Sequence, residues 1–239
     1  MIVYGRNAVR EALRGRRAGQ VHDIWLTAAA AREGGWPRDA RIASAEEIAE
    51  RCGSDGHQGV CADAGDYRYA DPRDLVGPQA LIVALDQIQD PQNLGAICRT
   101  AECAGAAGVV IPERRAAQVT GAVCKASAGA VEHLPVAQVR NLADFLVQAR
   151  DSQMWSYGAS ADRVDGADDP VPYDSVDYGG GGVVLVLGSE GEGLRRRVAS
   201  ECDQLISLPV RGNIGSLNVS AAAAALLYAI LQKTLDNSP

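Results

Sequence analysis

The sequence predicts an α/β fold in which a small α/β domain precedes a larger domain built on a parallel sheet. From residue 80 onward, short apolar runs alternate with stretches of helical periodicity, as in a parallel sheet with helical crossovers. Residues 66–78 hold two prolines and two tyrosines among charged residues, without periodicity, and read as a linker. We therefore expect domains at residues 1–65 and 79–239.

The small domain contains a row of arginines. Residues 5–13 have helical spacing, which places Arg6, Arg10, Arg14 and Arg17 on one face. Guanidinium groups suit phosphate, although a solvated helix face would show the same pattern. Strands are expected at residues 21–27 and 59–63, and Ser-Ala-Glu-Glu at residues 44–47 is a capping box that opens a helix to residue 51.

The larger domain is predicted to alternate strands with helices. The apolar runs predict strands at residues 80–86, 108–112, 134–139, 153–160, 183–188 and 203–209. Helices are expected at residues 93–106, 141–151, 192–200 and 217–235, with Asn93 as the N-cap of the first, and a helix or helix-loop at residues 118–130. The last helix is apolar on nearly every side, so it needs cover from its own domain and from a second subunit.

Composition narrows the function classes. A net charge of −7 argues against indiscriminate nucleic-acid binding, yet residues 1–20 carry five arginines against a single glutamate. The six cysteines form no C-x-x-C pair and the three histidines do not cluster with them, so neither a metal site nor disulfides are expected. The apolar run at residues 221–231 is too short to span a membrane and the N-terminus lacks a signal-peptide core, which favours a cytoplasmic protein.

Three segments carry the motifs of the larger domain. They are DQIQDPQNLGAICRTA at residues 86–101, LGSEGEGL at 187–194 and ISLPVRGNIGSLNVS at 206–220. In this order and spacing they resemble the three motifs of the SpoU-type (TrmH/RlmB-like) RNA ribose 2′-O-methyltransferases. The likeness covers residues 79–239, and residues 1–65 resemble more faintly the family's ribosomal-protein-like substrate-binding domain.

The resemblance implies a fold and an activity. The family has a SPOUT fold with a deep trefoil knot, which the residue pattern alone does not reveal because unknotted chains are the default. It implies a homodimer and S-adenosylmethionine as the methyl donor, held between the second and third motif loops. The implied cofactor contacts are Gly188, Ser189, Ile206, Leu208, Ser216 and Leu217.

The implied catalytic residues are Asn93, Arg99, Glu190, Ser216 and Asn218. Arginine stays protonated at any working pH, so we expect Arg99 to anchor the phosphate beside the target and polarise the 2′-oxygen rather than act as a general base. A helix pair with Glu102 is the structural alternative. Glu190 would orient Arg99 or a motif-three amide, and Ser216 could instead cap the last helix.

The expected RNA contacts are Arg6, Arg10, Arg14, His57, Gln58, Lys125 and Arg211, with Glu132 as a weaker candidate. Tyr67, Tyr69 and Trp155 could stack on bases, but core packing is the stronger expectation for so few aromatics.

The resulting hypothesis is 2′-O-methylation of a guanosine in 23S ribosomal RNA. Transfer RNA is the alternative substrate, and a non-catalytic RNA-binding or ribosome-assembly factor is an alternative function. A nucleotide-dependent Rossmann enzyme is disfavoured, since no G-x-G-x-x-G follows residue 86.

Overall fold

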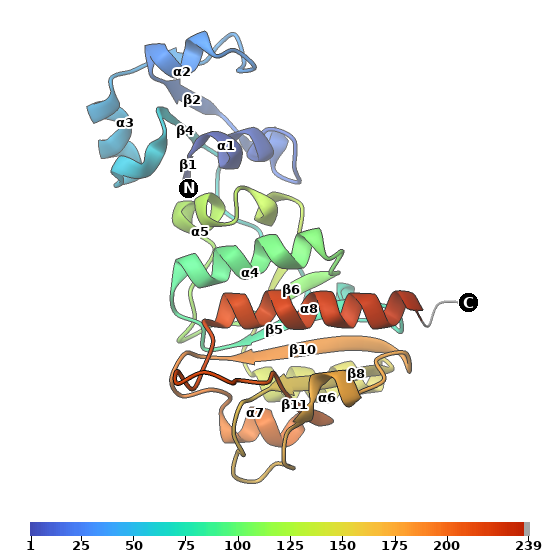
Figure 1. Cartoon of the computed structure of the whole chain (residues 1–239). Helices are drawn as coiled ribbons and strands as arrows, with labels where there is room; N and C mark the ends of the chain where they lie inside the picture. The colour runs from blue at the N-terminus through green and yellow to red at the C-terminus, as the bar shows by residue number, and fades with distance from the viewer. Residues whose placement is uncertain (237–239) are drawn as a thin grey trace.

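The computed structural model describes residues 1–236, which form two sheets (Figure 1). The smaller sheet has the order β1-β4-β2-β3, in which β1 and β2 run antiparallel to β4 while β3 runs parallel to β2. Its elements are β1 (Ile2–Tyr4), α1 (Arg6–Ala12), β2 (Asp23–Leu26), α2 (Ala28–Arg32), β3 (Arg41–Ile42), α3 (Ala45–Cys52) and β4 (Val60–Asp63). The predicted strands, first helix and Ser44–Glu47 capping box are confirmed, whereas β1, α2 and β3 were not predicted.

The larger sheet is parallel throughout and has the order β7-β6-β5-β10-β8-β11-β9. Its strands are β5 (Leu81–Asp86), β6 (Gly108–Pro112), β7 (Val136–Val139), β8 (Met154–Ala159), β9 (Val171–Pro172), β10 (Gly182–Gly188) and β11 (Gln204–Ser207). Its helices are α4 (Pro91–Cys103), α5 (Gly121–Ala126), α6 (Leu142–Asp151), α7 (Arg196–Glu201) and α8 (Val219–Asp236). All six predicted strands are confirmed, and only the two-residue β9 was missed.

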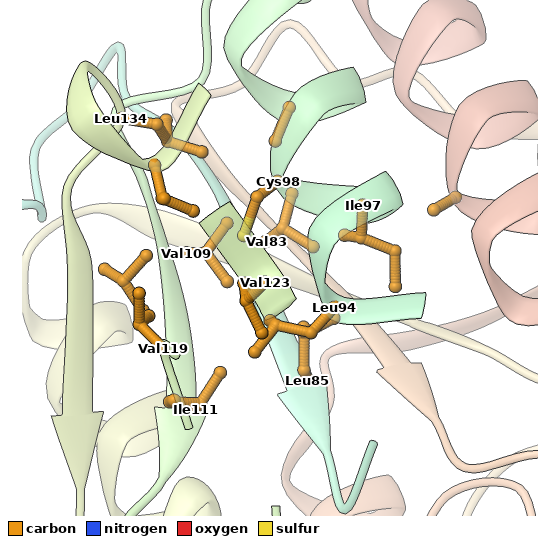
Figure 2. Packing of buried hydrophobic residues seen from close by; sticks show 14 of the residues in the cluster. Val83, Leu85, Leu94, Ile97, Cys98, Val109, Ile111, Val119, Val123 and Leu134 are labelled. Carbon is orange, nitrogen blue, oxygen red and sulfur yellow. The ribbon is translucent and has the colours of Figure 1, made fainter. Parts of the chain in front are cut away.

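Alternation along the strands explains the two layers of helices. Val83 and Leu85 of β5 face the side covered by α4, α5 and α8, whereas Ile82 and Ala84 face the side covered by α6 and α7. Figure 2 shows the first of these layers, where Leu94, Ile97 and Cys98 of α4 pack against β5 and β6. Burial raises the pKa of the Cys98 thiol to about 12, so this cysteine stays a protonated core residue.

The first helix of the larger domain begins earlier than predicted. Asp90 is its N-cap, accepting a hydrogen bond from the Gln92 amide at 2.9 Å, and Pro91 occupies the first helical position. The prediction that Asn93 caps this helix is therefore wrong. Asn93 lies in the first turn, so its side chain is free for another role.

Two other helices are shorter than their patterns suggested. The predicted helix at residues 192–200 is confined to α7, because Gly191 and Gly193 have positive φ angles and hold a tight turn before it. The predicted helix at residues 118–130 is confined to α5, which is followed by a short 3-10 helix at Ala130–Glu132.

The expected linker is docked along the larger domain. Tyr67 donates its hydroxyl proton to the Val131 carbonyl at 3.2 Å, and Ala70 forms a β-bridge with Ala137 of β7. Tyr67 and Tyr69 stack edge to face, 5.1 Å apart. Most buried side chains of the small domain join those of the larger domain in one hydrophobic cluster, so the two sheets share a continuous core, while Tyr4, Ile48 and Cys61 form a separate small cluster.

A buried ion pair lies at the junction between the two sheets. Arg17 is 4% exposed and donates from Nε to Glu132 Oε2 at 3.0 Å, while Glu132 is 1% exposed. The prediction that Arg17 shares an exposed row with Arg6 is thus wrong, because α1 ends at Ala12 and the chain turns inward. The expectation that Glu132 is a weaker RNA contact is not supported, because both of its carboxylate oxygens accept hydrogen bonds from Arg17.

No helix in residues 1–236 is long and apolar enough to cross a bilayer.

We predict that Glu132→Gln lowers the free energy of unfolding by about 3–5 kcal/mol, because it leaves the buried Arg17 charge unpaired. Denaturant unfolding followed by circular dichroism measures the loss. The matched control is Glu11→Gln, which removes the half-exposed Glu11–His133 pair at the same junction and should cost at most about 1 kcal/mol. Equal losses in the two variants would contradict the structural role of the buried pair.

Candidate functional site

The candidate site lies where the order of the larger sheet reverses. From β5 the chain moves to β6 and β7 on one side, while β10 and β8 lie on the other. Asp86 and Gly188 end the neighbouring strands β5 and β10 and are register partners. In open parallel sheets, ligands bind beyond the carboxyl ends of the strands at such a reversal.

A fully buried carboxylate anchors the loop after β10. Asp86 is 0% exposed; its Oδ2 accepts the Arg195 backbone N–H at 2.9 Å and its Oδ1 accepts Arg195 Nε at 2.7 Å. Because an unpaired carboxylate would be very costly there, this pair fixes where the loop ends. Sequence reasoning missed this role, and the only available signal was a lone carboxylate closing an apolar strand.

The second motif folds into a tight turn. Ser189 and Gly193 exchange two backbone hydrogen bonds, of 3.1 and 3.0 Å. Gly188 is required by a close approach, since a Cβ there would lie 2.1 Å from the Gly193 carbonyl carbon. The turn therefore presents Glu190 at its tip.

Glu190 joins the other two motifs. Its Oε1 accepts hydrogen bonds from Asn93 Nδ2 at 3.1 Å and from Asn218 Nδ2 at 2.6 Å, and Asn218 Nδ2 also lies 3.1 Å from Asn93 Oδ1. Asn218 caps α8 through its Oδ1, which accepts the Ser220 backbone N–H at 2.9 Å. Ser216 therefore does not cap this helix. The network fixes the first turns of α4 and α8 to one carboxylate, as the motif-three role expected for Glu190 requires.

A pocket of about 750 Å³ opens beside this network. Every residue predicted to bind the cofactor lines it, namely Gly188, Ser189, Ile206, Leu208, Ser216 and Leu217. Loop backbone and apolar side chains make up most of the wall, and Arg163 is the only cationic side chain among the described residues that line it. A site of this size and character suits a drug-sized ligand that has an apolar body and carries positive charge.

Arg99 lies apart from the network. It is exposed on α4, and its side chain makes no hydrogen bond or ion pair within residues 1–236, so the alternative pair with Glu102 does not form. Six residues of helix separate it from Asn93, which corresponds to about 9 Å along the axis and about 240° of rotation. Within one chain, Arg99 is therefore not oriented by Glu190.

The residues predicted to contact RNA differ in how many contacts they already make within the protein. Arg6 pairs with Glu33 at 2.8 Å, Arg10 stacks on Trp36 and Arg14 lies 3.6 Å from Glu11. Arg14 is exposed, whereas Arg6 and Arg10 are half-buried. His57 is 8% exposed, and its Nδ1 accepts the Gly59 backbone N–H, a position that shapes the turn.

Three further RNA-contact candidates lie near or beyond this turn. Gln58 accepts the Arg6 backbone N–H, Lys125 lies over the Tyr4 ring and Arg211 is exposed. Among the aromatics proposed for stacking, Trp155 is 50% exposed.

The last helix leaves one face uncovered. Buried side chains of α8, such as Leu227, pack toward α4 and β10. The residues on its outer face are Ala221, Ala225, Tyr228, Gln232 and Leu235, spaced at three and four. Tyr228 and Leu235 are 50% and 64% exposed.

In residues 1–236 no group of three His, Cys, Asp or Glu side chains could hold a metal ion.

Comparison with known proteins identifies this arrangement. Residues 80–228 match the model of the SpoU rRNA methylase family, and residues 2–70 match that of the RNA 2′-O ribose methyltransferase substrate-binding domain. A TrmH family tRNA/rRNA methyltransferase of Bacillus subtilis is 43% identical over 74% of this chain and 71% of its own length. A tRNA/rRNA methyltransferase of Synechocystis is 36% identical over 97% of this chain, which spans 62% of that relative.

Solved structures agree on the fold. The S-adenosylmethionine-bound rRNA methyltransferase of Sinorhizobium meliloti has a TM-score of 0.76 at 27% identity, with coverage of 97% of this chain and 86% of that one. The SpoU methyltransferase AviRb of Streptomyces viridochromogenes has a TM-score of 0.78 at 24% identity, covering 99% and 90% of the two chains. The chain, with its three motifs meeting at the reversal of a parallel sheet, belongs to the SpoU rRNA methylase family of RNA methyltransferases.

Proposed function

We propose that this protein transfers the methyl group of S-adenosylmethionine to a ribose 2′-hydroxyl of structured RNA, at a guanosine of 23S ribosomal RNA, in the cytoplasm where that RNA lies. The observation that carries the proposal is the meeting of Asn93, Glu190 and Asn218 at the rim of a pocket formed by the second and third motifs. The match of residues 2–70 to a ribose-methyltransferase substrate-binding model supports the 2′-O position. We assign residues 1–65 to RNA binding, 66–78 to the linker and 79–239 to catalysis.

The pocket fits the proposed donor. When bound, S-adenosylmethionine supplies an electrophilic methyl group on a sulfonium. The walls at Leu208 and Leu217 offer apolar cover for an adenosyl group, while Glu190 and Glu192 bring negative charge to the same pocket. The S. meliloti relative that binds S-adenosylmethionine supports this assignment. Gly188 keeps the backbone of the second motif close enough to form the floor.

The amide–carboxylate network positions the acceptor side of the reaction. Glu190 fixes the rotamers of Asn93 and Asn218, so both amide groups keep a constant orientation at the pocket rim. We assign Ser216, which lines the pocket beside them, to a hydroxyl contact with substrate or donor. Holding a ribose hydroxyl in line with a methyl group supplies much of the rate enhancement for such a transfer.

We assign Arg99 to the RNA phosphate that flanks the target ribose. Its guanidinium is exposed and unpaired in the described residues, and its offset along α4 suits a neighbouring phosphate better than the 2′-hydroxyl bound by the same chain. That phosphate, or water, then accepts the hydroxyl proton. Arg6, Arg10, Arg14, Gln58, Lys125 and Arg211 extend the RNA surface, and His57 holds the turn that carries Gln58.

We further propose that the C-terminal segment is knotted and that the protein is a homodimer. From β11, residues 208–218 return past the Glu190 turn to reach α8 beside α4, the kind of crossing that a trefoil knot needs. The uncovered face of α8, with exposed Val210, Ile214 and Leu217 in the preceding loop, forms an apolar surface that monomers rarely leave bare.

Arg99→Ala should lower the rate of methyl transfer by about 100-fold or more, while the affinity for S-adenosylmethionine changes only a few-fold. Arg99→Lys should also fail, because a point charge cannot make a bidentate phosphate contact. Labelled methyl transfer to protein-free 23S ribosomal RNA and isothermal titration measure the two quantities. Glu102→Ala is the control and should stay active. An unmodified protein that binds the donor but labels no RNA would refute the proposed function, and an active Arg99→Ala would remove Arg99 from it.

Ala225→Arg should split the dimer, since it puts an unpaired charge at the centre of the exposed α8 face that the proposed dimer would bury, at a cost of several kcal/mol. Sedimentation velocity at micromolar concentration measures the state. Ala29→Arg, on the exposed face of α2, is the matched control and should remain dimeric. If the unmodified protein is monomeric and fully active, the dimer proposal is contradicted.

A further inference from the structure

A second, smaller cavity lies at the junction of the two sheets. It has a volume of about 120 Å³ and lies between the end of α1, the linker and the 3-10 helix at Ala130–Glu132. The buried Arg17–Glu132 pair lines it together with Gln20 and Tyr67, and Arg16 and Arg68 complete it from exposed positions. Three segments that are far apart in the chain thus enclose one cavity.

The charges around this cavity do not cancel. Arg17 is neutralised by Glu132 and also donates to the Ala64 carbonyl at 3.4 Å, so it is committed to the fold. Arg16 and Arg68 make no ion pair in the part of the chain that the structure describes. Glu132 is the only acidic side chain among the lining residues. The cavity therefore carries two uncompensated positive charges in a protein whose net charge is −7.

The polar groups of the cavity favour an anion that accepts hydrogen bonds. Two guanidinium groups offer only donors, in a fork that matches phosphate oxygens. Tyr67 uses its hydroxyl proton on the Val131 carbonyl, and the Arg17 guanidinium lies 5.1 Å from the Tyr67 ring centre, which holds that ring in place. A cavity several times larger than one water site has room for a single phosphate group.

We propose that this junction cavity binds one backbone phosphate of the substrate RNA, gripped by Arg16 and Arg68. The inference rests on the proposed function, because it takes RNA as the source of the phosphate. Both arginines flank fixed points, Arg17 and Tyr67, so a phosphate held here ties the RNA to the small domain and the linker at once. The RNA would then run along the junction rather than over the small domain alone.

The test is the salt dependence of RNA binding. In Arg16→Gln/Arg68→Gln, the slope of log affinity against log salt should flatten by about 0.7–0.9, the value for one lost phosphate contact. Binding of protein-free 23S ribosomal RNA is measured by filter retention at several salt concentrations. Arg32→Gln/Arg38→Gln removes the same charge from exposed positions of the small domain outside the cavity and should keep the slope. Donor affinity and melting temperature should be unchanged in both variants.

Equal flattening in both pairs, or none in the cavity pair, would overturn the proposal. Inorganic phosphate at constant ionic strength tests the other source of the same anion. If it raises the melting temperature of the unmodified protein but not of Arg16→Gln/Arg68→Gln, while RNA binding is the same in both, the cavity holds free phosphate instead. If the unmodified protein methylates RNA but Arg16→Gln/Arg68→Gln keeps the unmodified salt slope, this inference alone is refuted. If the unmodified protein neither binds S-adenosylmethionine nor transfers its methyl group to RNA, the proposed function itself is refuted.

Discussion

The Glu190 carboxylate is the contact on which the proposed active site depends. One oxygen accepts hydrogen bonds from two asparagines that lie 125 positions apart in the chain, Asn93 in the first turn of α4 and Asn218 directly before α8. Asp86 and Arg195 fix the far end of the same loop, so the tip cannot drift without leaving the buried Asp86 carboxylate unpaired. Because hydrogen bonds to an ionised carboxylate are stronger than those between neutral groups, a short turn can connect α4, α8 and the pocket wall through one side chain.

A paired carboxylate also holds the junction between the two sheets in place. Arg17 and Glu132 are both almost fully buried, and removing either partner would leave a charge without compensation. Together with the continuous core and the docked linker, this pair makes the small domain part of one body with the larger sheet. The RNA surface proposed on α1 is thereby held in a defined position relative to the pocket, which suits a structured rather than an extended substrate.

Much of the fold could be predicted because residues close together in the sequence determine most of its strands and helices. Apolar runs such as residues 80–86 and the capping box at Ser44 need only their neighbours to be recognised. The failures involve long-range partners: Arg17 has helical spacing with Arg6, yet its partner is 115 residues away, and Asp86 gave no sign of Arg195. The three motifs taken together predicted cofactor residues that line one pocket, whereas the meeting of Asn93, Glu190 and Asn218 needed the folded chain. Asn93 was misplaced as a cap because Asp90 and Pro91 compete for the same helix start.

The account's central claim is that the accepted methyl group lies on a ribose oxygen. Alkaline hydrolysis tests it most directly, because cleavage of RNA needs a free 2′-hydroxyl. After transfer from labelled S-adenosylmethionine to protein-free 23S ribosomal RNA, the RNA is hydrolysed and its products are separated. The account predicts that the label stays in one alkali-resistant dinucleotide whose 5′ nucleoside is guanosine. Label recovered in ordinary mononucleotides would place the methyl group on a base and contradict the account.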